Sequence, residues 1–303
     1  MTRNAGRAGL LISAVLLLSL LGGCEGALYD FWGTKREEAT NLLLRVENGD
    51  KAAYAKLVDL SSLAKGADPY AAAQLGYVYQ VGLGGIPIDL AKAKAEYDKA
   101  KGVIKEADYN AGLIELGKGM YEEAVERFLL AAGGQDRDGM TIAMVQMAKV
   151  YEAGRAGAPM SESLAAEWYE YATAKGDLFA KTRFALILLQ GKGRATDIAR
   201  GMSLLEQAAV FGNREARVAM SAIYAKPTID GVQQSHELAA KWLLVSGEGS
   251  PTLQKAGAAY MAALEPEVQK AVMDSVELFN MGHKGIVEPD DYNAPLRIQK
   301  AAK

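Results

Sequence analysis

The sequence predicts an all-α solenoid, in which antiparallel pairs of helices stack side by side around a shared core. Between residues 30 and 300 the residues Ala, Leu, Glu, Lys and Tyr dominate at helical spacing, and no stretch alternates β-branched residues as a strand would. Gly and Pro recur at intervals where they would end helices. A pattern of small and large residues returns about every 36 positions, which indicates a repeat architecture.

The first 23 residues have the features of a cleavable targeting segment. Arg3 and Arg7 make its start positive, and residues 10–21 form an apolar run. This run is shorter than the roughly 20 residues that a permanent membrane-spanning helix needs. We therefore expect residues 1–23 to be a signal peptide that is removed.

A lipid-attachment signal follows the apolar run. Residues 21–24 read Leu-Gly-Gly-Cys, an order that resembles the lipobox of bacterial lipoproteins and implies acylation of Cys24. Cys24 is the only cysteine, so acylation also removes a free thiol from the oxidising periplasm. Glu25 follows it where Asp would resemble an inner-membrane retention signal, which favours anchoring in the outer membrane, facing the periplasm. The alternative is an ordinary signal peptide that happens to contain a Cys.

Four copies of the repeat are clear, at residues 71–102, 143–176, 180–212 and 216–249. In the third copy a small residue, Ala180, opens the first helix, and Phe184 and Ala185 stand four and five positions later. Small residues let two antiparallel helices approach closely, and large ones fill the space between them. Gly at positions 11 and 13 permits positive φ where the first helix stops. Stacked hairpins bury the apolar face that a single hairpin leaves open.

The pattern resembles the Sel1-like repeat, a relative of the tetratricopeptide repeat. The match is strongest at residues 168–176, Trp-Tyr-Glu-Tyr-Ala-Thr-Ala-Lys-Gly, in the second helix of its copy. The resemblance implies a right-handed superhelix whose concave side is lined by the first helices of the repeats.

The chain on either side of the clear copies follows the pattern less closely. Residues 107–134 look like a shortened copy, residues 37–66 like a degenerate helix pair and residues 253–281 like a final cap. Pro289 and Pro295 favour an irregular end of the chain. The predicted segments are a lipidated tether, the solenoid and an irregular C-terminal tail, at residues 24–36, 37–281 and 282–303.

Catalytic and metal-binding signals are weak. His236 and His283 are the only histidines, and neither stands in a cluster of carboxylates or Cys that is typical of a metal site. The Gly-rich residues 82–85 and 191–193 lack the spacing and the preceding strand of a phosphate-binding loop, so turns between helices explain them. We predict no enzyme, no metal site and no cofactor other than the covalent lipid on Cys24.

The three tryptophans divide into two kinds. Trp168 and Trp242 fall at the packing position of a second helix, which favours a role in the core over stacking on a sugar. Trp32 stands eight residues after Cys24, where it could touch the bilayer interface or pack on the first helix.

The best candidate binding surface consists of the first-helix positions that the packing pattern leaves free. These positions would line the concave side, and their mixture of polar, aromatic and cationic groups suits a protein or peptide partner. The candidates are Tyr77, Gln80, Gln146, Lys149, Arg183 and Gln190. A solvated face without a partner is the alternative.

A helical-repeat array without an evident catalytic group is typical of a binding scaffold. The net charge of −3 gives no basic field for nucleic acid. Together with the lipid anchor, the resemblance implies a periplasmic scaffold similar to the lipoproteins of alginate-type exopolysaccharide secretion, with an outer-membrane β-barrel porin or other secretion-complex proteins as partners. The alternatives are an adaptor or regulator of peptidoglycan synthases or hydrolases, a host-interaction lipoprotein, and an enzyme with a site between repeats.

Overall fold

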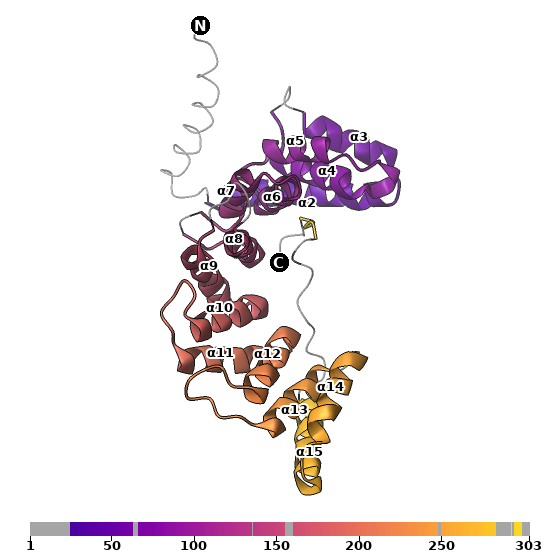
Figure 1. Ribbon diagram of the computed structural model, residues 1–303. Coiled ribbons are helices and arrows are strands. Elements are labelled where there is room, and N and C mark those ends of the chain that lie inside the picture. Colours follow the sequence, from indigo (N-terminus) through magenta and orange to yellow (C-terminus); the bar gives the residue numbers. More distant parts are fainter. Residues whose placement is uncertain are drawn as a thin grey trace. The chain divides into compact units, whose positions relative to one another are not determined.

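The computed structural model describes residues 25–62, 66–134, 136–154, 160–247, 250–282, 292 and 294–298, with the backbone alone for residues 25–32. Within these residues the chain forms fourteen α-helices and one short 3-10 helix, and no strand (Figure 1). The predicted all-α fold is confirmed. Residues 1–24, with the predicted signal peptide and Cys24, lie outside the described residues, as does His283.

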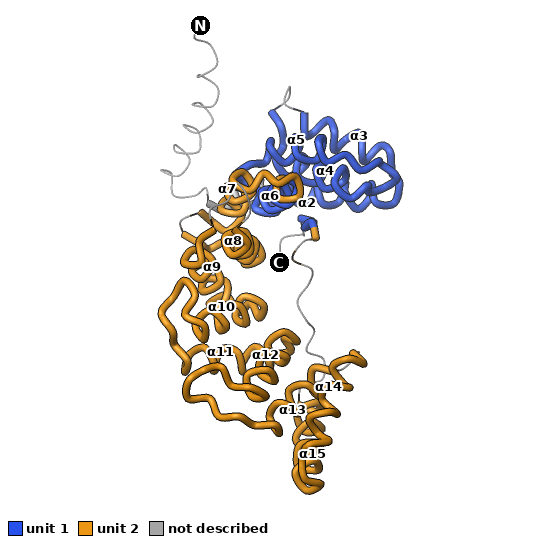
Figure 2. Tube along the Cα trace, in the orientation of Figure 1, with its two compact units in different colours: residues 1–114, 295–303 blue, residues 115–294 orange. Residues whose placement is uncertain are grey.

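The chain divides into two compact units, shown in blue and orange in Figure 2. Unit 1 consists of residues 1–114 and 295–303, and unit 2 of residues 115–294. The end of the chain therefore belongs to the same unit as the first helices, although most of the sequence separates them.

Unit 1 contains the first helices of the chain. They are α2 (Glu25–Glu47), α3 (Lys51–Leu60), α4 (Pro69–Val81), the 3-10 helix η2 (Leu83–Gly85), α5 (Leu90–Lys99) and the first part of α6 (Lys105–Gly117). Helix α2 begins at Glu25, so residues 25–36 of the expected tether are helical. Helices α4 and α5 pack against each other as the two members of the first clear repeat.

Unit 2 continues the series of helix pairs. Its elements after the end of α6 are α7 (Tyr121–Ala131), α8 (Thr141–Ala153), α9 (Glu162–Ala174), α10 (Leu178–Gln190), α11 (Ile198–Val210), α12 (Arg214–Ala225), α13 (His236–Ser246), α14 (Pro251–Met261) and α15 (Pro266–Gly282). The pairs α8–α9, α10–α11 and α12–α13 correspond to the other three clear repeats, and α13 also packs against α14 and α15.

Each repeat packs as its small and large residues predict. In α10, Ala180 and Ala185 are fully buried and Phe184 is 1% exposed. The helix ends at Gly191, whose φ of 68° is left-handed, as expected for a Gly at this position. Trp168 and Trp242 are each only 5% exposed, so both belong to the core, as predicted.

The second helices begin at a side-chain cap. Asp89, Ser161, Asp197 and Ser235 each accept a hydrogen bond from the backbone N–H three residues later, at 2.9–3.2 Å. Such a cap satisfies one of the N–H groups that the first turn of a helix leaves free. An Asp or Ser at this place of the repeat therefore fixes the residue at which the second helix starts.

The Gly-rich stretches are turns between helices, as predicted, and they also lie against a helix of the preceding helix pair. A Cβ atom at Gly193 would stand 2.2 Å from the carbonyl oxygen of Glu162, at the start of α9. A Cβ at Gly84 would stand 2.1 Å from the carbonyl oxygen of Val46, in α2. The second Gly of the loop is therefore required by close packing between neighbouring repeats as well as by its positive φ.

Candidate functional site

One position of the first helices carries a polar side chain in repeat after repeat. It stands three residues after a fully buried Ala, and we call it the inner position. The preceding alanines are Ala71, Ala107, Ala143 and Ala180. The residues at the inner position are Gln74 in α4, Asn110 in α6, Gln146 in α8 and Arg183 in α10. The three amide side chains are almost completely buried, at 0–1% exposed.

In unit 1, two inner residues hold the main chain of the C-terminal residues. The side chain of Asn110 donates to the carbonyl oxygen of Leu296 and accepts from its backbone N–H, both at 2.7 Å. Gln74 donates to the carbonyl oxygen of Ile298 at 3.2 Å. We call Tyr292 and residues 294–298 the tail segment. Its described residues form no helix or strand, so these amide groups supply hydrogen bonds that secondary structure does not.

The side chains of the tail segment complete the core of unit 1. Ile298 is 3% exposed and belongs to an apolar cluster with Ala73, Tyr97 and Ala107. Arg297 pairs with Glu47 at 2.9 Å. The site thus combines main-chain hydrogen bonds with one apolar side-chain position and one charged position.

The hydroxyl of Tyr97 fixes the groups around Asn110. It donates to Gln80 at 2.7 Å and accepts from the Asn110 amide at 3.2 Å. Burial raises the pKa of Tyr97, which therefore stays a neutral phenol able to donate and accept at once. The Tyr97 hydroxyl thus links Gln80 to the same Asn110 amide that binds Leu296.

In unit 2, the inner residue Gln146 makes the same kind of contact. Its side chain donates to the carbonyl oxygen of Tyr292. The Tyr292 hydroxyl donates to Asp177 at 2.8 Å, and its ring lies 5.2 Å from the ring of Phe179. Burial raises the pKa of the Asp177 carboxyl, although bonds from the Ala180 backbone and the Tyr292 hydroxyl act in the opposite direction.

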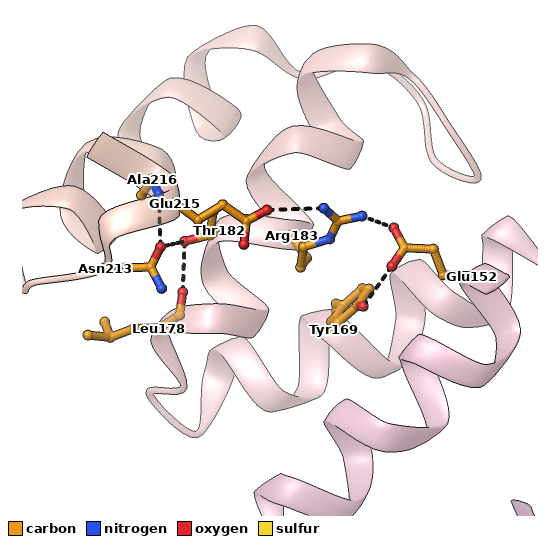
Figure 3. Close-up of polar contacts among 8 residues, drawn as sticks. All are labelled: Glu152, Tyr169, Leu178, Thr182, Arg183, Asn213, Glu215 and Ala216. Atoms are coloured by element: carbon orange, nitrogen blue, oxygen red, sulfur yellow. Dashed lines mark hydrogen bonds and ion pairs between the residues drawn. The ribbon is translucent and has the colours of Figure 1, made fainter. Parts of the chain in front are cut away.

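The fourth inner residue, Arg183, is cationic and links three first helices of unit 2 (Figure 3). It donates to Glu152 of α8 and, at 3.2 Å, to Glu215 of α12. Burial alone would lower the pKa of Arg183, but these carboxylates raise it above its usual value. The Tyr169 hydroxyl donates to Glu152 at 2.9 Å, so the whole group is held in one arrangement.

A cavity of about 420 Å³ lies in unit 2 beside these groups. Its lining includes Gln146, Lys149, Phe179 and Arg183. The Lys149 ammonium lies 5.9 Å from the centroids of both the Phe179 and the Tyr292 rings. Cationic, aromatic and amide groups therefore surround a space large enough for a side chain or a short peptide.

The six predicted surface residues separate into three groups. Gln146, Lys149 and Arg183 come together at the cavity of unit 2. In α4, Tyr77 is half-buried against an apolar cluster and Gln80 is bound to Tyr97. Gln190 is exposed at the last residue of α10 and does not line the cavity.

Sequence reasoning missed Gln74, Asn110 and the tail segment. The spacing between Gln74, Asn110 and Gln146 was a usable signal, because an amide recurs three residues after each small residue. Asn110 was overlooked because its repeat lacks the long Gly-rich loop. No pattern in the sequence indicated which surface the tail segment contacts.

In the described part of the chain, no three His, Cys, Asp or Glu side chains gather as a metal ion would require. Among the helices described, none is long and apolar enough to cross a membrane. His236 is exposed at the start of α13, with its ring 6.0 Å from that of Tyr260.

Comparisons with known proteins place the repeats in a family. Residues 69–100, 141–177, 180–209 and 215–248 match the Sel1 repeat family. The crystal structure of a Sel1 repeat protein from Oxalobacter formigenes is 24% identical with a TM-score of 0.60, over 78% of this chain and 96% of that one. A protective antigen of uropathogenic Escherichia coli with an SLR fold is 16% identical with a TM-score of 0.45, over 81% of this chain and 61% of that one. A comparison with curated proteins gave no match.

Proposed function

Because four stretches of this chain match the Sel1 repeat family, we propose that it is a lipid-anchored scaffold that binds a partner protein. The binding surface would be the faces of the first helices that carry the inner positions, which we call the inner faces. One observation carries the proposal. The inner residues Asn110, Gln74 and Gln146 each bind the main chain of a segment without helix or strand. An extended polypeptide that is buried on a surface loses the hydrogen bonds that its backbone N–H and C=O groups make to water. Buried amide side chains directed at the main chain replace those hydrogen bonds, so they suit a surface that holds an extended polypeptide.

The anchor is the second part of the proposal. Residues 1–23 would be removed as a signal peptide, and the Cys24 thiol would carry lipid. More than one acyl chain is needed for stable attachment. Because Glu25 stands after Cys24, the proposed location is the outer membrane, with the repeats in the periplasm.

For the partner we propose an outer-membrane β-barrel porin or another protein of an exopolysaccharide export complex of the alginate type. The proposal rests on a resemblance in sequence organisation: a lipobox followed by Sel1-like repeats, as in the lipoproteins of alginate-type exopolysaccharide secretion. A lipid-held array beside a barrel would present its first-helix faces to periplasmic segments of that barrel or of the proteins that meet it.

The proposed anchor predicts the outcome of Cys24→Ala. The substituted protein should leave the membrane fraction, because it lacks the thiol that would be acylated. Fractionation with intact-mass measurement tests this expectation, and wild-type protein should carry the mass of its lipid. A lipid-modified mass and membrane attachment in Cys24→Ala would contradict the anchor.

The partner is tested by crosslinking the anchored protein in intact cells, purifying it and identifying its crosslinked peptides by mass spectrometry. Crosslinks from the first helices to an outer-membrane barrel or to polysaccharide-handling proteins support the export scaffold. Crosslinks to peptidoglycan enzymes, or labelling of the protein at the cell surface, would overturn the export role. Crosslinks confined to the second helices would overturn the inner face as the binding surface.

A further inference from the structure

We propose that the face of unit 1 that carries Gln74 and Asn110 is a binding site for an extended peptide with a basic residue directly before an aliphatic one. We propose further that the tail segment is its resident, displaceable occupant. This inference rests on the proposed scaffold function and deepens it, because it names the partner's chemistry and a control on its access. In the tail segment, Arg297 and Ile298 are the residues that show this pattern.

The hydrogen bonds at this site recognise a main chain rather than particular side chains. Asn110 forms a two-bond clamp on the N–H and C=O groups of Leu296, and Gln74 binds the next carbonyl but one, that of Ile298. Any extended segment presents the same groups at the same spacing, because alternate residues of an extended chain point to the same side. A segment from another protein therefore fits these amides as well as the tail segment does.

The side chains of the occupant supply the selectivity. Ile298 is buried in an apolar cluster that includes Ala73, Tyr97 and Ala107, and such surroundings suit an aliphatic side chain. Glu47 pairs with Arg297, so a basic residue one position earlier is favoured over an acidic one. These two preferences define the partner: a segment with a basic residue directly before a buried aliphatic residue.

The tail segment leaves this site incompletely satisfied. Gln74 is fully buried, and its Oε1 accepts no hydrogen bond from any residue that the structure describes. Its amide group donates to Ile298 at 3.2 Å and to Thr40 at 3.4 Å, the longer end of the range for such bonds. An incoming peptide that also donates an N–H to Gln74 would bind more tightly than the tail segment, since an unsatisfied buried acceptor is costly.

Binding in trans to the full chain tests the inference. The probe is a fluorescent synthetic peptide with the sequence of residues 290–300, and the protein is the full chain in detergent, with or without Ile298→Asp. The charged substitution expels the chain's own tail from the apolar cluster. We expect the peptide to bind Ile298→Asp at least about tenfold more tightly than wild type, measured by fluorescence anisotropy.

Two matched controls separate the site from general stickiness. Adding Asn110→Ala to Ile298→Asp should weaken peptide binding roughly tenfold or more, because two hydrogen bonds are lost. Adding Asn280→Ala, a change of the same residue type at an exposed position of α15, should leave binding unchanged. A peptide that itself carries Ile298→Asp should not bind. Equal binding to wild type and Ile298→Asp, or no binding by Ile298→Asp that keeps its helical circular dichroism and melting temperature, overturns the proposal.

Hydrogen exchange on the unsubstituted chain gives a test that does not require any variant to fold. An isotopically labelled peptide, distinguishable by mass, should speed exchange in the chain's own residues 294–298 as it displaces them. Unchanged exchange at saturating peptide overturns displacement. This failure is separate from failure of the scaffold function, which is decided by the crosslinks of the anchored protein.

Discussion

Gly76 in α4 faces the ring of Tyr97 in α5 at a distance that leaves no room for another carbon atom. A Cβ atom at this residue would stand 2.6 Å from Tyr97 Cε1 and 2.7 Å from Cδ1. The ring is fully buried and its hydroxyl is bound to Gln80 and Asn110, so it has no free direction in which to move. The small residue of the repeat pattern is here a steric requirement.

Gly76→Ala should therefore destabilise the protein by about 1–2 kcal/mol. Overpacking costs roughly 1–3 kcal/mol, and the better helix propensity of Ala returns up to about 1 kcal/mol. The denaturation midpoint in urea measures the difference. Gly117→Ala, in α6 with nothing within 4 Å of the added carbon, is the matched control and should be neutral or stabilising. A midpoint for Gly76→Ala at or above wild type would show that the ring yields.

Asp177 gives the molecule a pH dependence opposite to that of most carboxylates. Burial raises its pKa above the unfolded value of 3.8, so the folded state holds the proton more tightly than the unfolded state. This group therefore stabilises the fold increasingly as the pH falls through its folded pKa, and the gain is complete below 3.8. At neutral pH the buried charge lowers the stability.

Asp177→Asn should be at least as stable as wild type at pH 7, because Asn caps α10 equally well without a charge. The advantage should shrink as the pH falls, because wild-type Asp177 takes up its proton at a higher pH in the folded state than in the unfolded state. Chemical denaturation of both proteins at pH 7 and pH 4.5 measures this difference. An advantage of Asn that grows with acidity would mean that the carboxylate is favourably paired in the folded state.

At the scale of elements, the helix pairs and their ends were predictable from sequence. The repeat has a local pattern of small residues such as Ala180 and Ala185, large ones such as Phe184, and a Gly after them. This pattern predicts a closely packed helix pair and the residue at which its first helix ends. The inner amides were less visible, because a polar residue on a helix usually faces water. Their function depends on a segment far away in the sequence, and no local pattern reports such a contact.

Arg217 in α12 shows how the last helices of unit 2 are joined. It donates to the carbonyl oxygen of Ala209 at 2.8 Å and to that of Val245 at 3.0 Å, and its guanidinium lies 5.2 Å from the centroid of the Phe279 ring. One side chain thus contacts residues of α11, α13 and α15. The sequence offered no sign of this role, because Arg on a helix surface is common.

Arg217→Met should cost about 1–3 kcal/mol, because two carbonyl groups near helix ends lose their donor. In a repeat array each repeat contacts chiefly its neighbours. Faster hydrogen exchange is therefore expected in α11–α15, with α3–α5 of unit 1 unchanged. Lys255→Met, at an exposed position of α14, is the control. Faster exchange throughout both units would show that the molecule opens as a single cooperative body.

For the molecule as a whole, the order of helix pairs followed from the sequence, and the return of the tail segment did not. The prediction of an irregular tail at residues 282–303 rested on composition, which is silent about where an extended segment lies. Leu296 and Ile298 meet residues more than 180 positions earlier through main-chain hydrogen bonds. Because almost every residue type has the same main-chain groups, the amino-acid sequence of a segment held by such bonds does not indicate where the segment binds.

A segment carried on the same chain competes for Asn110 and Gln74 at an effective concentration on the order of millimolar, whatever the amount of protein in the cell. A partner present at micromolar concentration must therefore bind about a thousandfold more tightly than the tail segment to replace half of it. The docked tail segment thus sets an affinity threshold, because peptides that bind weakly do not replace it. Only a partner of higher affinity, or one held nearby at high local concentration, binds the site.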